Sequence, residues 1–70
     1  MAAARSRGDL TARQLQVVAL LAAGLRYTEV AAELSISARQ VQRHAAQAVE
    51  RSGAINVCQL IAMIIEEGLI

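Results

Sequence analysis

The chain has 70 residues, 56% of them hydrophobic, and a formal net charge of +1. A chain of this length forms one domain at most and buries only about 60% of the surface that it exposes when unfolded, which leaves little room for a deep catalytic pocket. We therefore expect no enzyme. Its single cysteine excludes an internal disulfide, and without a metal-ligand cluster we expect neither a metal nor a cofactor.

The residue types favour helices. Proline is absent, Tyr27 is the one aromatic residue, and alanine, leucine, glutamine and arginine are abundant. These are good helix formers, and the turn residues that strand proteins need are scarce. The fold class predicted from composition is therefore all-α, with a core of aliphatic side chains.

The charges are unevenly distributed along the chain. All seven basic residues are arginines within the first 51 positions, which hold only four of the six acidic residues, so this part has a net charge of +3. Arginine favours forked, bidentate recognition over point-charge attraction. The apolar runs 17–25 and 60–65 are far shorter than the roughly 20 residues of a membrane span, and we expect a cytoplasmic protein without a membrane partner.

Residues 1–8 are predicted to form a flexible arm that carries Arg5 and Arg7, and residues 9–70 to form the domain. Thr11 and Gln14 have the spacing of a capping box, which predicts a first helix over 12–23. Gly24 is placed to end this helix in a left-handed conformation. Periodicity assigns Leu15, Val18, Ala19 and Ala22 to its buried stripe, with Leu21 and Leu25 beside it.

Three further helices are predicted, over 27–34, 38–52 and 57–67. Ser37 with Gln40 and Asn56 with Gln59 repeat the capping spacing, and Gly53 and Gly68 follow the predicted ends. The inward residues are expected to be Val30, Ala31 and Leu34 in the second helix, Val41, Ala45, Ala48 and Val49 in the third, and Leu60, Ile61, Ile64 and Ile65 in the fourth.

The second and third helices are joined by only Ser35, Ile36 and Ser37, which is typical of a helix-turn-helix unit. An α-helix fits the major groove of DNA, where arginine pairs with guanine and glutamine with adenine. The third helix supplies this chemistry within nine residues, at Arg39, Gln40, Gln42, Arg43 and Gln47. The plain alternative is that these residues form the solvated face of an amphipathic helix.

The sequence from Asp9 to Ile70 resembles the LuxR/GerE-type helix-turn-helix domain of bacterial transcription regulators. The stretches that carry the resemblance are Leu10-Thr11-Ala12-Arg13, Val18-x-Leu20-Leu21-Ala22-x-Gly24-Leu25, Glu29-Val30-Ala31-x-x-Leu34-x-Ile36-Ser37, Val41-x-x-His44, Gly53, and Gly68-Leu69-Ile70. The resemblance implies four helices, of which the third enters the major groove of double-stranded DNA and the fourth pairs with its copy in a homodimer.

The chain also departs from the pattern of that family. The family usually has Glu where Gln14 stands, Thr at Gln40, Lys at Gln42, Asn at Gln47 and Leu at Ser52. Position 42 thus loses a typical basic contact. We expect the fold to be retained and the sequence preference to differ.

Other residues are assigned to the same two surfaces. His44 coincides with a family histidine beside the phosphate backbone, and a phosphate or structural role is expected for it. Arg26, Tyr27 and Thr28 open the second helix, where backbone N–H groups can hold a phosphate, and Arg51 is added to the DNA-binding set. The outward strip of the fourth helix, where a symmetry mate would dock, is expected to contain Cys58, Gln59, Ala62, Met63 and Glu66.

Two functions follow as hypotheses. The first is a sequence-specific transcription regulator, a stand-alone protein or an excised effector domain, which binds two half-sites as a homodimer and takes no small-molecule ligand within this chain. The second is a protein-interaction module of the same fold, which docks on RNA polymerase or another regulator through its hydrophobic fourth helix. The low net charge and Gln42 favour the second, whereas Arg39 and Arg43 favour the first.

Overall fold

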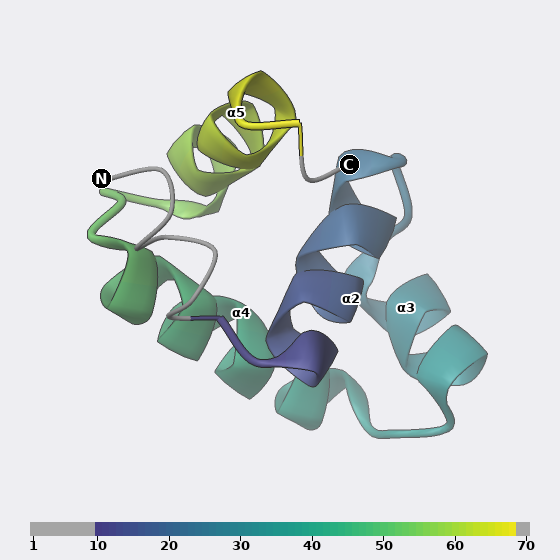
Figure 1. Cartoon of the computed structure of the whole chain (residues 1–70). Coiled ribbons are helices and arrows are strands. Elements are labelled where there is room, and N and C mark those ends of the chain that lie inside the picture. Colours follow the sequence, from purple (N-terminus) through teal and green to yellow (C-terminus); the bar gives the residue numbers. More distant parts are fainter. Residues whose placement is uncertain (1–9, 69–70) are drawn as a thin grey trace.

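The computed structural model describes residues 10–68, which form four helices and no strand. These are α2 (Ala12–Ala22), α3 (Tyr27–Leu34), α4 (Ala38–Ser52) and α5 (Val57–Glu66), joined by short turns (Figure 1). The all-α prediction is confirmed, and the predicted bounds are correct except that α2 and α5 each end one residue earlier than expected. The predicted arm over 1–8 lies outside the described residues.

Helix α4 is the centre of the structure. It contacts each of the other three helices, whereas α3 and α5 do not contact each other. Figure 1 shows α3 near the beginning of α4 and α5 near its end. Helix α2 also contacts both α3 and α5, so α2 and α4 together form the frame to which the other two helices are attached.

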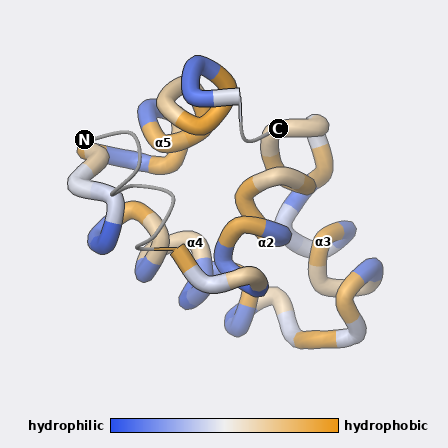
Figure 2. Tube along the Cα trace, in the orientation of Figure 1, coloured by the Kyte–Doolittle hydropathy of each residue, from blue (hydrophilic) through white to orange (hydrophobic). Residues whose placement is uncertain are grey.

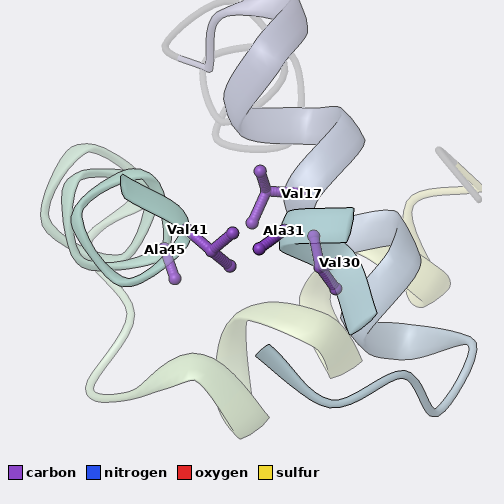
Figure 3. Packing of buried hydrophobic residues seen from close by; sticks show 5 residues of the cluster. All are labelled: Val17, Val30, Ala31, Val41 and Ala45. Carbon is purple, nitrogen blue, oxygen red and sulfur yellow. The ribbon is translucent and has the colours of Figure 1, made fainter. Parts of the chain in front are cut away.

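The buried side chains form two clusters, one on each side of this frame. The first cluster joins α2, α3 and α4 (Figure 3) and consists of Val17, Val30, Ala31, Val41 and Ala45. The second cluster joins α2, α4 and α5 and consists of Val18, Ala48, Leu60 and Ile64. Adjacent residues on a helix point about 100° apart, which is why Val17 and Val18 enter different clusters.

The buried row of α4 is Val41, Ala45 and Ala48, with the i, i+4, i+7 spacing of one helix face. Its first two members belong to the first cluster and its third to the second cluster. Figure 2 shows hydrophilic positions along the opposite, outer side of α4. Two of the three inward residues are alanines, and such small side chains permit a short distance between helix axes.

The predicted stripe of α2 is partly wrong. Val18 is buried as expected, but Leu15, Ala19 and Ala22 are only half-buried, whereas Val17 and Gln14 are fully enclosed. The reason is that α2 contacts α3, α4 and α5 at once, so its buried face is wider than one stripe and is centred on the row that meets α4.

Two predictions for α5 are also wrong. Ile65 was expected to face inward and is 55% exposed, and Met63 was expected to face outward and is half-buried. Because α5 contacts only α2 and α4, its fully buried stripe is narrow and consists of Leu60 and Ile64. Ile65 follows Ile64 by about 100° around the axis and therefore leaves the interface.

Three other residues expected to face inward are half-buried at the edges of the two clusters. These are Leu34 beside the first cluster, and Val49 and Ile61 beside the second.

The predicted caps are present. In α2 the Gln14 backbone N–H donates to Thr11 Oγ1 (3.1 Å) and the Thr11 N–H donates to Gln14 Oε1 (3.2 Å). Ser37 and Gln40 form the same reciprocal pair at the start of α4, at 3.1 and 2.9 Å. These bonds satisfy N–H groups that have no partner within the helix, and they fix the residue at which each helix begins.

The turn between α3 and α4 depends on Ser35, whose φ is +58°. The Ile36 N–H donates to the Ala31 carbonyl (3.0 Å) and the Ser35 N–H to the Ala32 carbonyl (3.4 Å), which is the bonding of a Schellman cap. Ile36 packs against the first cluster. Because Ser37 then caps α4, this short turn fixes the direction of α4 relative to α3.

At the other end of α4, Ser52 closes the turn that leads to α5. Its hydroxyl donates to the Val49 carbonyl (3.1 Å) and accepts from the Ala54 N–H (3.3 Å), and Gly53 follows with φ +80°. A serine at position 52 therefore gives this turn its own hydrogen bonds.

Within residues 10–68, no single helix is long and apolar enough to cross a membrane. Only α4 and α5 taken together reach the required length and hydropathy, and this pair is bent by 63°.

Replacing Ser35 with glycine should stabilise the protein. A side chain in the left-handed region costs roughly 1–2 kcal/mol, and the extra unfolded-state entropy of glycine offsets part of this. We expect Ser35→Gly to raise the free energy of unfolding by about 0.5–1 kcal/mol and Ser35→Val to lower it, as measured by urea denaturation. Equal stabilities for the two variants would contradict the left-handed conformation.

Two residues of α5 provide a paired test of its packing. Leu60→Ala removes a fully buried side chain from the second cluster and should lower the free energy of unfolding by about 2–5 kcal/mol. Ile65→Ala removes an exposed side chain and should change it by less than about 0.5 kcal/mol. Thermal unfolding followed by circular dichroism measures both, and a larger effect for Ile65 would show that α5 is rotated.

Candidate nucleic-acid interface

The outer face of α4 is the one helical surface in the described chain that is rich in arginine and amide groups. All five residues predicted to read bases are exposed on α4, namely Arg39, Gln40, Gln42, Arg43 and Gln47. Arg43 lies opposite the buried row, and Arg39 is one turn before it. The polar residues around Arg39 and Arg43 lie on consecutive turns of the same helix, so the distances between them are fixed by the geometry of α4.

The charge of this face is not balanced by its own helix. The positions one turn before and after Arg43 hold Arg39, Gln40, Ala46 and Gln47, and none of them is acidic. Glu50 is the only acidic residue of α4, and it lies seven residues beyond Arg43, roughly 10 Å along the axis. The first half of α4 therefore has a positive outer surface, to which the positive end of the helix dipole adds.

Gln40 has a structural partner. Its Oε1 accepts the Ser37 backbone N–H (2.9 Å), so this side chain completes the cap of α4. The sequence predicted two roles for Gln40, as a partner of Ser37 in the cap and as a residue that contacts a base. The amide NH₂ group is the part of Gln40 that remains for a ligand.

Gln47 has a partner on another helix. Its Oε1 accepts from Nε2 of Gln14 at 3.3 Å, across 33 positions of sequence. Gln14 is 3% exposed and is the one buried polar residue in the described chain. The capping role of Gln14 could be predicted from its spacing to Thr11, but its burial and its bond to Gln47 could not, because they depend on where α4 lies.

His44 and Arg51 lie away from Arg43. His44 is half-buried at the border between the outer face and the core. Arg51 is exposed in the last turn of α4, where a cation interacts favourably with the helix dipole, and it is 12 residues, or about 18 Å, from Arg39. The structure thus places Arg39, Gln42 and Arg43 together and places Arg51 at the far end.

The first turn of α3 differs from the other three helix starts in the described chain. At the start of α2, α4 and α5 a side-chain oxygen of the N-cap residue accepts a backbone N–H, whereas Arg26, the N-cap residue of α3, provides no such acceptor. Thr28 is exposed, and Tyr27 is half-buried against the first cluster. The N–H groups of this turn can hold an anion, although Glu29, which accepts the Arg26 N–H at 2.7 Å, places a negative charge at the same end.

The outward side of α5 has a more apolar surface than predicted. Of the five residues expected there, Cys58, Gln59, Ala62 and Glu66 are exposed and Met63 is half-buried. The structure adds Ile65, and also Ile55, which precedes the helix and is 81% exposed. Within α5, Cys58, Ala62 and Ile65 form a row with spacings of four and three residues, which is the seam pattern of paired helices, and Ile55 lies just before the start of this helix.

Helix α3, the turn 35–37 and α4 have the order and connection of a helix-turn-helix unit, and the polar, positively charged outer face belongs to the second helix of that unit. The domain is therefore of the class that binds double-stranded DNA. Residues 9–64 match the family model described as bacterial regulatory proteins, luxR family. The chain belongs to this family and is a DNA-binding helix-turn-helix domain of a transcription regulator.

Comparison with curated proteins gives no match, and neither does comparison with solved structures.

Proposed function

We propose that the protein recognises a specific operator sequence by inserting the first half of α4 into the major groove, and that it does so as a homodimer. The observation that carries the proposal is the unbalanced positive face around Arg39 and Arg43, on a helix whose other side is held in both hydrophobic clusters. A groove about 12 Å wide accepts one α-helix of this size.

Each part of the surface then has a separate role. Arg39 and Arg43 donate to guanine O6 and N7 or to phosphate oxygens, and Gln42 contacts an adjacent base. The first turn of α3, with Arg26, Tyr27 and Thr28, holds a backbone phosphate, and His44 and Arg51 lie toward the phosphates that flank the groove. Contacts to phosphate set the position of α4, and contacts to base edges set the sequence preference.

The homodimer uses the exposed row of α5. A two-fold axis beside Ala62 would bring Cys58, Ala62 and Ile65 against their copies, because a two-fold interface pairs the same surface with itself. This arrangement covers apolar side chains that are exposed in one chain. Two recognition helices related in this way suit half-sites about 10 base pairs apart, centre to centre.

The same row supports a second function. Ile55 and Ile65 are the two large hydrophobic residues exposed in the described chain, and both lie on the α5 side rather than on α4. A surface of RNA polymerase or of another regulator could cover them in place of a second copy. This alternative leaves α4 free to bind DNA and differs from the first proposal in its oligomeric state.

The first test is binding of duplex DNA at several salt concentrations, measured by fluorescence polarisation. Each phosphate contact adds about 0.9 to the slope of log affinity against log salt. Arg43→Ala should weaken binding to a selected site by about 1–3 kcal/mol. Arg43→Lys keeps the charge but loses the fork, so it should retain non-specific affinity and lose base preference.

The two substitutions separate charge from base recognition. If the affinity of the unmodified protein for DNA does not change with salt concentration, the proposed phosphate contacts are contradicted. Unchanged preference in both variants would place the base contacts elsewhere on α4.

The second test concerns the oligomeric state. Ala62→Arg places a charge in the middle of the α5 row and should convert a dimer into a monomer in sedimentation velocity, without loss of helicity. The matched control is Ala32→Arg, an exposed alanine on α3 that should leave the dimer intact. A monomeric unmodified protein that also binds DNA as one copy would contradict the homodimer and favour the alternative partner.

A further inference from the structure

The bond between Gln14 and Gln47 joins the buried start of α2 to the DNA-facing side of α4. Gln14 Nε2 donates and Gln47 Oε1 accepts at 3.3 Å. Gln14 is almost completely buried, whereas Gln47 is exposed. One end of the Gln47 amide is thus occupied from behind, and the other end is the part available to a ligand.

The direction of each amide follows from a chain of donors and acceptors. A backbone N–H can only donate, so the atom of Gln14 that faces the Thr11 N–H at 3.2 Å must be its oxygen. The other end of Gln14 is then an NH₂ group, which can only donate. The atom of Gln47 that faces it must therefore be the oxygen, and the NH₂ group of Gln47 is the end that remains.

Gln14 is not free to reverse its amide. Its backbone N–H is bonded to Thr11 Oγ1 at 3.1 Å, and its side chain is enclosed beside the core. A reversed Gln14 amide would place two donors against each other at Thr11, because the backbone N–H of Thr11 cannot accept. Buried polar groups in such positions are left unsatisfied, which strongly disfavours the reversed state.

We propose that Gln14 is a positioning residue that sets the hydrogen-bond polarity of Gln47, so that the NH₂ donor of Gln47 is turned outward and its oxygen is held toward Gln14. The proposal rests on the proposed function of α4 as the reading helix. Guanine presents two acceptors in the major groove, whereas adenine presents an acceptor and a donor. Because Gln14 occupies one of the two lone pairs of Gln47 Oε1 and holds this oxygen inward, the outward NH₂ group favours the two acceptors of guanine over the mixed edge of adenine.

The variant Gln14→Glu reverses this polarity and keeps the size and shape of the side chain. A glutamate at the third helical position still accepts the Thr11 N–H, so the capping box is kept. A carboxylate can only accept, so Gln47 must turn its NH₂ group inward and present its oxygen. Gln14→Met is the matched control, because it keeps the length of the side chain and removes both polar ends.

The first measurement needs no DNA. Exchange of the side-chain amide protons with water is followed by NMR in the parent protein and in Gln14→Glu, with the exposed Gln16 and Gln42 as internal references. We expect Gln47 to exchange as fast as the references in the parent protein and several-fold more slowly in Gln14→Glu. Slow exchange of Gln47 in the parent, or no change in the variant, would overturn the assigned polarity.

The second measurement is selection of binding sites from randomised duplexes by the parent, Gln14→Glu, Gln14→Met and Gln47→Ala. The base pair that Gln47 contacts is the one at which Gln47→Ala loses its base preference. At this base pair we expect the preference of Gln14→Glu to shift about tenfold from guanine toward adenine or cytosine. We expect Gln14→Met to show no preference there. Changes at many base pairs would show a merely structural role and overturn the proposal, as would no change at any.

Failure of the proposed function gives a different result. If the parent protein shows no salt-sensitive binding to any duplex, the proposal that α4 binds DNA is contradicted, and so is the role of Gln47 in base selection. The exchange measurement then still decides whether Gln14 sets the direction of the Gln47 amide.

Discussion

Burial of Val41, Ala45 and Ala48 on one side of α4 is the constraint on which the other features depend. A helix of 15 residues is only marginally stable in water by itself. Here one row of side chains holds its first half in the cluster with α2 and α3 and its second half in the cluster with α2 and α5. The arginines on the opposite side acquire fixed positions because this row is fixed. The two alanines contribute by bringing α2 close enough for Gln14 to reach Gln47.

The features that could be predicted from the sequence are those decided within a few residues. The capping pairs at Thr11 and Ser37 and the left-handed Gly53 located the helix ends, because their hydrogen bonds join positions two to four apart. The exposed face of α4 was also predictable, since its buried row has a clear period. The turn at Ser35 could be located from its length, but its left-handed conformation on a non-glycine residue could not.

The features that could not be predicted depend on which helices meet. Whether Val17 or Leu15 enters the core is decided by the direction from which α3 and α5 approach α2. Ile65 is as hydrophobic as Ile64 but lies on the side of α5 that no helix covers. Gln14 carries a capping signal, and nothing near it in the sequence shows that a second amide 33 positions away completes its bonding.

The two clusters have a consequence for communication through the domain. Because α3 and α5 do not contact each other, an event at the outward row of α5 has no direct route to the first turn of α3. The packing that links these two surfaces runs through α2, α4 and Val57, the first residue of α5, which packs against the first cluster. A shift of α2 or α4 would repack both clusters together. A partner that covers the outward row of α5 and leaves Val17, Val18 and Val57 in place can therefore bind without changing the angle between α4 and the rest of the domain.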